Sequence, residues 1–219
     1  MTPAQLSQNL QSRFDVPVGF REYQIRRPYP CGIADVDELL GGGFPRGAVS
    51  EISGNQSSNR TALTVSILVH ACDAGECCAW IDAGGTFDPE SAAEAGLRLE
   101  QLLWINCQGQ AEAALKAAYL LLHGGGFGLI VFDLADVSEA SVRRISMSSW
   151  FRLRRAAEET GTALITLTPT PQIRSFSAVC VELKRTKSLW RGKLLRGLAS
   201  LLETRKHTGL RSASFESVL

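Results

Sequence analysis

The sequence predicts an α/β fold, in which a doubly wound, mainly parallel sheet is flanked by helices. Short apolar strand candidates alternate with helix candidates from residue 48 to residue 185. The first strand candidate runs into a small polar loop and then an apolar helix, and a later strand candidate ends in an acid, Asp133. Right-handed crossovers place the carboxyl ends of parallel strands at one edge of a sheet, so we expect the loop and Asp133 to lie there together.

Local residue patterns predict the individual elements. Leu6, Leu10 and Phe14 recur every four residues and predict a short amphipathic helix over 3–14. A proline-punctuated arm follows, and from Gly32 a short helix and a glycine-rich turn lead into the first strand. The further elements expected are helices over 61–72, 88–96, 110–123 and 141–160, and strands over 77–82, 102–107, 127–134, 163–170 and 177–185.

The composition is that of an ordinary globular chain, with 45% hydrophobic and 21% charged residues and a formal charge of +1. This balance excludes a strongly basic whole-chain surface, so any contact with nucleic acid must come from local patches. The chain lacks both an apolar run of the about 20 residues that span a membrane and a signal-peptide pattern, so we expect a cytoplasmic protein without membrane contact. The six cysteines form no C-x-x-C pair and the three histidines lie far apart, which predicts buried free thiols and no metal site.

The loop after the first strand partly matches the phosphate-binding pattern G-x-x-x-x-G-K-[ST]. Gly54 and Thr61 are in place, whereas Asn59 replaces a glycine and Arg60 replaces the lysine. Asparagine tolerates positive φ, so the loop can still fold, but a planar guanidinium differs in shape from an ammonium group. The pattern fits a degenerate nucleotide site or a polar loop that caps a helix. The residues of such a nucleotide site are Gly54, Ser57, Ser58, Asn59, Arg60, Thr61 and Asp133.

Beyond these motifs, the chain resembles the RecA recombinase fold along almost its whole length. GIADVDELLGGGFPRGAVSEISGNQSSNRTAL resembles the segment that leads into the RecA phosphate loop, and IDAGGTFDP resembles the next strand with its acidic loop. GLIVFDL resembles the strand whose aspartate, here Asp133, orients magnesium. The resemblance implies an N-terminal helix and arm over 1–30 and a RecA-like core over 31–219, without the RecA C-terminal domain. It also implies that residues 190–219 form a closing β-hairpin, although their leucine spacing would equally suit a helix.

Departures from RecA imply that ATPase activity is lost. Gly84 stands where RecA-type ATPases carry the glutamate that activates the attacking water, a kind of group that contributes ~10²–10⁴-fold in rate. Thr168 and Pro169 replace the polar pair that senses nucleotide in the family. Together with Arg60, these changes predict no catalytic residue, no significant ATPase activity, and at most weak binding of ATP and magnesium.

Within the superfamily, the chain resembles ImuA, the RecA-like accessory protein of bacterial damage-induced mutagenesis. LLWINC, HGGGFGLIVFDLADV and RRISMSSWFRLRRAAEETGTALI carry this resemblance. It implies a non-catalytic adaptor in translesion DNA synthesis, with an ImuB-like inactive polymerase and RecA as partners and with self-association through residues 1–30. One alternative is a weak, DNA-stimulated ATPase related to recombinases. Another is a cell-division inhibitor resembling SulA, against which the intact FGLIVFD strand argues.

Two basic segments that contain aromatic residues are candidates for contact with single-stranded DNA or with a protein partner. One surrounds Trp150 and Phe151, and the other surrounds Trp190 and runs from Lys184 to Arg196. The alternative for both is a solvated basic face with its aromatic side chains in the core. The candidate binding residues are Arg143, Arg144, Arg152, Arg154, Arg155, Arg174, Lys184, Arg185 and Lys187.

Overall fold

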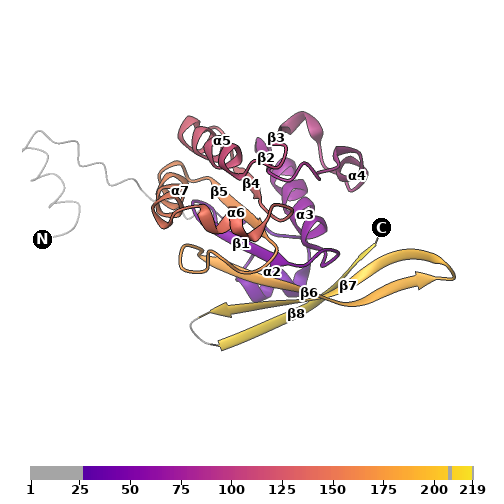
Figure 1. Cartoon of the computed structure of the whole chain (residues 1–219). Helices are drawn as coiled ribbons and strands as arrows, with labels where there is room; N and C mark the ends of the chain where they lie inside the picture. The colour runs from indigo at the N-terminus through magenta and orange to yellow at the C-terminus, as the bar shows by residue number, and fades with distance from the viewer. Residues whose placement is uncertain (1–26, 207–208, 219) are drawn as a thin grey trace, which may run out of the picture.

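The computed structural model describes residues 27–206 and 209–218, which form an eight-stranded sheet with helices on both faces (Figure 1). The strands are β1 (Val49–Gly54), β2 (Cys78–Asp82), β3 (Leu102–Asn106), β4 (Leu129–Asp133), β5 (Ala163–Thr168), β6 (Val179–Arg191), β7 (Leu194–Lys206) and β8 (Gly209–Val218). The helices are α2 (Ala34–Leu40), α3 (Arg60–Asp73), α4 (Pro89–Glu94), α5 (Ala111–Gly124), α6 (Glu139–Arg144) and α7 (Met147–Thr160), with a 3-10 turn, η1, at Leu99–Gln101. The predicted helix over 3–14 lies outside the described residues.

The order of strands across the sheet is β3-β2-β4-β5-β1-β6-β7-β8. β1 to β6 pair in parallel, whereas β7 and β8 are antiparallel additions at one edge. The predicted doubly wound, mainly parallel α/β sheet is therefore confirmed. Residues 194–206 and 209–218 form the closing strands, so the helix that the leucine spacing would also allow is not formed in these residues.

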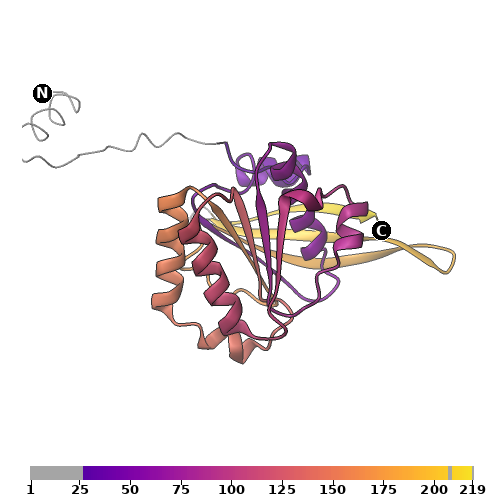
Figure 2. The ribbon, with the colours of Figure 1, turned by 90° about the horizontal axis from the view of Figure 1, so that it is seen from above.

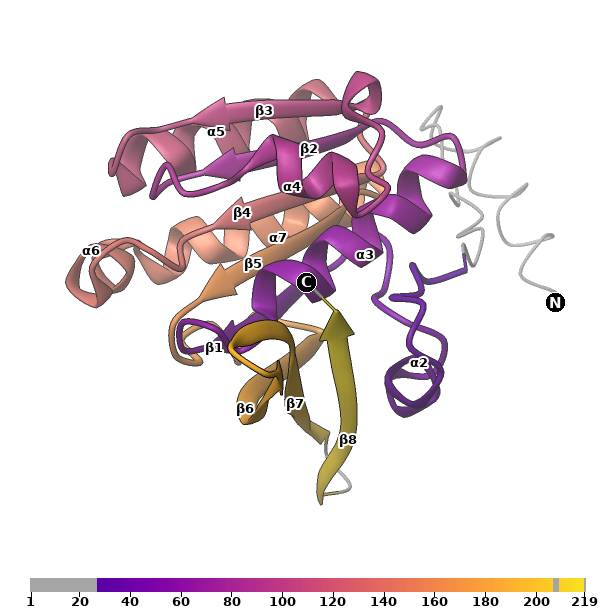
Figure 3. The same ribbon diagram turned by 90° about the vertical axis from the view of Figure 1, so that its right-hand side faces the viewer.

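Two apolar cores lie on opposite faces of the sheet, since successive strand residues point to opposite sides. Trp80 and Val131 belong to the core beneath α2, α3 and α4. Their neighbours Ile81 and Phe132 belong to the core beneath α5, α6 and α7. Figures 2 and 3 show these two helical layers separated by the strands. All four side chains are fully buried, which explains why these strands read as continuous apolar runs.

The chain joins the core at Tyr29, within the segment predicted as the arm. The backbone of Tyr29 exchanges two hydrogen bonds of 2.8 Å with Phe44. The guanidinium of Arg46 lies 3.8 Å from the centre of the Tyr29 ring and forms an ion pair of 2.5 Å with Glu76. A Cβ atom at Gly43 would lie 2.1 Å from the Tyr29 carbonyl oxygen, so this approach requires glycine. Tyr29 is thus part of the packed domain, although it lies within the segment predicted as the arm.

Two predicted boundaries were wrong. The single helix expected over 141–160 is divided into α6 and α7, because Ile145 is extended and Ser146 caps a new helix by accepting a 3.1 Å hydrogen bond from the Ser149 amide. The strand expected over 177–185 continues to Arg191, since its cross-strand hydrogen bonds to β7 persist beyond the body of the sheet.

All six cysteines are free, and four of them, Cys31, Cys72, Cys78 and Cys107, are buried. Burial raises the pKa of the Cys31 thiol to about 12, so this thiol stays protonated at neutral pH. No described helix has the length and apolar character needed to cross a membrane.

Candidate functional site

The loop from Gly54 to Thr61 lies at the carboxyl edge of the sheet, between β1 and α3. Asp133 ends β4 in register with Asp82, which ends β2, and Thr168 ends the neighbouring β5. The structure therefore brings together the loop and the acid that the sequence placed at one edge. A Cβ atom at Gly54 would lie 2.7 Å from the carbonyl oxygen of Leu183 on the neighbouring strand β6, so close packing requires glycine at the first motif position.

The Arg60 side chain is turned into the protein, and only 7% of the residue is exposed. One guanidinium nitrogen, Nη1, donates to the carbonyl oxygen of Gly54 and, at 3.3 Å, to that of Thr168. Burial lowers the pKa of Arg60, and the charges of Asp133 and Asp136 oppose this shift. The residue that replaces the motif lysine thus joins the ends of β1 and β5 by internal hydrogen bonds.

Asp133 is buried next to other acids. Burial raises the pKa of the Asp133 carboxyl to about 7, and the charges of Asp82 and Asp136 act in the same direction. The amide of Ala135, which donates a 3.0 Å hydrogen bond, and the charge of Arg60 lower it again. Without a bound cation, the carboxyl is consequently divided between its charged and neutral forms near neutral pH.

Asn59 connects the loop to the C-terminal strands. Its backbone has a positive φ of 67°, which confirms the expectation that asparagine could replace the motif glycine. The side-chain amide donates to the Leu198 carbonyl and to Ser200 Oγ, each at 2.9 Å, and its oxygen accepts from Ser217 Oγ at 2.7 Å. The substitution of asparagine for glycine therefore provides three hydrogen bonds to β7 and β8.

We expect Asn59→Gly to lower the free energy of unfolding by about 1–3 kcal/mol, because three hydrogen bonds of about 0.5–1.5 kcal/mol each are lost while glycine relieves the positive φ. Urea unfolding measures this loss, and hydrogen exchange should become faster in β8. Ser57→Gly is the matched control, since Ser57 is exposed and has a φ of 59°. Unchanged stability and unchanged β8 exchange in Asn59→Gly would contradict the role assigned to this side chain.

The position of the family's water-activating glutamate is sterically restricted. A Cβ atom at Gly84 would lie 2.9 Å from Cβ of Asp136. Asp136 in turn accepts a 3.0 Å hydrogen bond from the Thr86 hydroxyl, and Asp82 accepts from the amides of residues 85–87 at 2.6 to 3.2 Å. The loop is ordered around glycine at this position, and a glutamate there would have to displace Asp136.

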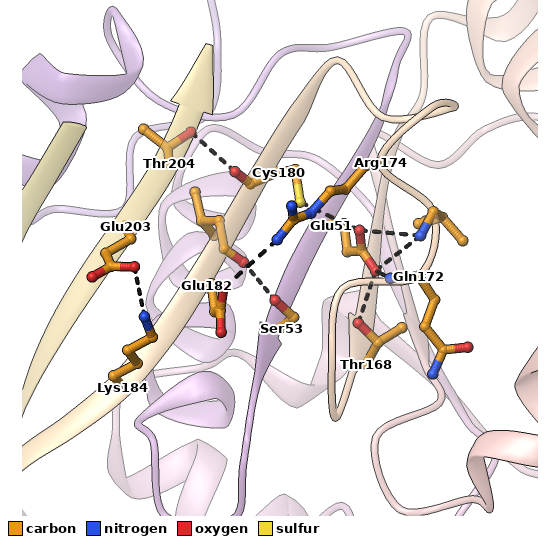
Figure 4. A network of polar contacts seen from close by, with 12 residues as sticks. Glu51, Ser53, Thr168, Gln172, Arg174, Cys180, Glu182, Lys184, Glu203 and Thr204 are labelled. Carbon is orange, nitrogen blue, oxygen red and sulfur yellow. Dashed lines mark hydrogen bonds and ion pairs between the residues drawn. The ribbon is translucent and has the colours of Figure 1, made fainter. Parts of the chain in front are cut away.

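Glu51, in the middle of β1, is a buried carboxylate that the sequence reasoning missed (Figure 4). It accepts hydrogen bonds from Thr168 Oγ1 at 2.9 Å, from the amide of Gln172 at 2.7 Å, and from the amide of Ile173 at 3.2 Å. Cys180 Sγ lies 3.3 Å away as a further donor, and burial together with the Glu51 charge raises the pKa of this thiol to about 12. One acidic residue within an apolar strand was the available sequence signal.

The effect of Glu51 is to hold the loop between β5 and β6 against the sheet. This loop begins directly after Thr168, the last residue of β5. A second contact on the same side is the 3.7 Å ion pair between Arg174 and Glu182 (Figure 4). Arg174, one of the predicted binding residues, is therefore engaged with the neighbouring strand.

Most of the predicted basic residues on α6 and α7 are paired within their own helix. Arg143 pairs with Glu139, Arg154 with Glu158 and Arg155 with Glu159, at 2.8 to 3.3 Å. Arg152 lies over the Tyr119 ring at 5.0 Å, and Arg144 is exposed. Trp150 is buried in the core, whereas Phe151 is 51% exposed. Of the five arginines, Arg144 and Arg152 form no ion pair within the described residues, so this surface presents two cations without a carboxylate partner.

The second basic segment, around Trp190, differs from α6 and α7 in its ion pairing and in the exposure of its tryptophan. Lys184 pairs with Glu203 at 2.7 Å. Arg185 and Lys187 are exposed, and neither forms an ion pair with another described residue. Trp190 is 61% exposed, so its aromatic ring does not belong to the core.

This topology, with a helix-starting loop opposite an acid at the carboxyl edge, defines an α/β protein of the phosphate-loop type. Residues 19–144 match the RecA N-terminal domain model. The chain therefore belongs to the RecA N-terminal domain family.

Individual relatives agree with this assignment. The chain is 28% identical to "Protein RecA 1" of Myxococcus xanthus over 200 residues, which cover 77% of this chain and 58% of that protein. It is 39% identical to "Protein RecA" of Clavibacter michiganensis over 105 residues, or 48% of this chain and 29% of that protein. The chain thus matches only part of the length of these relatives. The crystal structure of the RadB recombinase superposes with a TM-score of 0.65 at 17% identity, covering 85% of this chain and 94% of that one, which shows a shared fold.

Proposed function

We propose that this chain is a non-catalytic RecA-like adaptor in damage-induced mutagenesis and translesion DNA synthesis, similar to ImuA. The observation that carries the proposal is the use of the altered motif side chains in internal contacts. Arg60 donates to the carbonyls of Gly54 and Thr168, and Asn59 donates to β7. These side chains stabilise the fold in place of the contacts that a phosphate loop makes with its ligand.

The residues present fit ATP and magnesium poorly. Binding would involve the backbone of residues 54–61 and the side chains of Thr61 and Asp133. Yet the Arg60 guanidinium is engaged with two carbonyls, and Gly84 itself has no side chain that could activate water. We therefore propose a RecA fold that serves as a scaffold for partners, including RecA and an ImuB-like polymerase relative, and that contacts single-stranded DNA.

Nucleotide turnover by the purified protein, with and without single-stranded DNA, is the first test. We expect no hydrolysis above that of Asp133→Ala under either condition. DNA-stimulated hydrolysis that Asp133→Ala abolishes would contradict the proposal and would support the alternative of a weak ATPase.

The adaptor role is tested on the same preparation by co-purification with RecA and with the ImuB-like protein. The N-terminal arm resembles the RecA segment that packs on the next protomer, so we expect the intact chain to retain RecA and a chain lacking residues 1–26 to lose it. Truncation at this point keeps Tyr29 and its pairing with Phe44, so the core stays intact. Failure of the intact chain to bind either protein would contradict the adaptor proposal.

A further inference from the structure

β6 and β7 extend beyond the helical layers as a two-stranded ribbon (Figures 1 and 2). Each has 13 residues, whereas β1 to β5 have five or six. The ribbon ends in a two-residue turn at Gly192, whose φ of 65° suits the first central position of a type II′ turn. Trp190 and Leu194, next to the turn, are 61% and 58% exposed. The tip thus presents apolar side chains to solvent without cover from the described part of the chain.

The charge of the ribbon is of one sign. From Lys184 to Leu202 the sequence has six lysines and arginines and no acidic residue. Lys184 pairs with Glu203 at the base. The other five are all exposed and form no ion pair within the described residues: Arg185, Lys187, Arg191, Lys193 and Arg196. The ribbon therefore offers more cations without an ion pair than α6 and α7 do.

Cations and an aromatic ring occur close together at the tip. Trp190 lies opposite Leu195 and Arg191 lies opposite Leu194, so the ring and the nearest cation are on opposite faces of a thin ribbon. Between the pairs Leu189–Gly197 and Trp190–Leu195 the register shifts by one residue, so Arg196 is the extra residue of a bulge that bends β7 next to the tip. A ligand that matches both features needs negative charge along its length and flat surfaces that can stack on an indole.

We infer that the β6–β7 ribbon binds single-stranded nucleic acid, with Trp190 stacked on a base and the neighbouring lysines and arginines on phosphates. An acidic peptide would satisfy the cations but offers no flat partner for the indole. In a duplex the bases are already stacked on one another, so single strands are favoured. The inference rests on the proposed function, in which the chain contacts single-stranded DNA. It assigns this contact to a surface outside the phosphate-loop region.

Binding of the intact protein to a fluorescent oligo-dT strand, followed by anisotropy at several salt concentrations, tests the inference. We expect Trp190→Ala to weaken binding about 5- to 150-fold, as for loss of one base–aromatic stack. Trp104→Ala is the matched control, because Trp104 is 41% exposed on β3 at the opposite edge of the sheet, and its affinity should be unchanged. Both substituted side chains are exposed, so folding should survive, which circular dichroism verifies.

The contribution of the ribbon cations to binding is measured separately, by the dependence of affinity on salt concentration. Arg191→Ala combined with Lys193→Ala should reduce the slope of log affinity against log salt by about 1.4, since each single-strand phosphate contact contributes about 0.7. Lys116→Ala, on the exposed side of α5, should leave the slope unchanged. Equal binding of duplex DNA, poly-glutamate or anionic vesicles would overturn the inference, and so would loss of binding in Arg143→Glu/Arg144→Glu but not in the ribbon variants.

The two proposals fail separately. If the intact protein does not bind the strand, the ribbon inference and the proposed DNA contact are overturned, while the proposed non-catalytic role in binding partner proteins remains. If DNA stimulates ATP hydrolysis, the adaptor proposal is overturned, while a ribbon-dependent affinity still supports the inference.

Discussion

Replacement of Glu51 by alanine is expected to lower the free energy of unfolding by about 2–4 kcal/mol and to release the loop between β5 and β6. The amides of Gln172 and Ile173 would lose their acceptor within the protein, and an unsatisfied buried donor costs about 1–3 kcal/mol. The Thr168 hydroxyl and the Cys180 thiol would lose the same partner. Burial of the polar carboxyl group itself carries a desolvation cost, and its removal offsets part of the loss, so the expected value lies below the sum of these hydrogen bonds.

Urea unfolding gives the change in stability, and hydrogen exchange at residues 169–178 shows whether the loop is released. Glu182→Gln is the matched control, because it removes the exposed ion pair to Arg174 on the same side of the sheet. Such a pair is expected to contribute less than about 1 kcal/mol. If Glu51→Ala exchanges no faster than Glu182→Gln in this loop, Glu51 does not hold it.

Asp133→Asn is expected to stabilise the protein increasingly as the pH rises. The pKa of Asp133 is raised from 3.8 to about 7 in the folded chain, so the folded state binds this proton more tightly than the unfolded state does. The stability that this group contributes is full below the unfolded pKa and is lost as the pH rises to about 7. Asparagine does not ionise, and its oxygen can still accept from the Ala135 amide.

The stability difference between Asp133→Asn and the unsubstituted chain should therefore grow by about 2–3 kcal/mol between pH 5 and pH 8. Urea unfolding at several pH values measures it. Asp136→Asn serves as the control because Asp136 is an exposed neighbour of the same site. A difference that is constant with pH, or that shrinks as pH rises, would show that Asp133 is not a buried acid with a raised pKa. The expected gain in stability of Asp133→Asn at high pH would indicate that the protein keeps the Asp133 carboxyl group at a cost in stability.

The helical pairs on α6 and α7 could have been predicted from the sequence. Arg154 and Glu158 are four residues apart, which places them on one face of a helix. The same spacing holds for Arg155 and Glu159, so local reasoning could have removed these arginines from the candidate binding residues. The cations without ion pairs on the β6–β7 ribbon could not be predicted in this way. Their exposure depends on how far β6 continues to pair with β7, and sequence spacing does not show this.

Asn59 and Glu51 show the limit of local reasoning. The sequence indicated that Asn59 tolerates positive φ, because this is a property of one residue. Its hydrogen bonds to Ser200 and Ser217 depend on where β7 and β8 lie in the sheet, and no spacing along the chain encodes this. From the sequence, Glu51 is recognisable only as an acid within an apolar strand. Its role is visible only in the fold, because its hydrogen-bond donors lie on the loop that follows β5.

The sequence by itself determined the α/β class, the position of the phosphate-loop-like turn, and its approach to Asp133, because alternating apolar strands and helices allow few parallel arrangements. Only the tertiary structure decided what the altered residues do. Arg60 and Asn59 form hydrogen bonds within the protein to residues more than 100 positions away in the sequence. The continuation of β6 beyond the body of the sheet leaves Trp190 and the neighbouring lysines and arginines exposed. Burial and strand order create these effects, and both are properties of the assembled sheet.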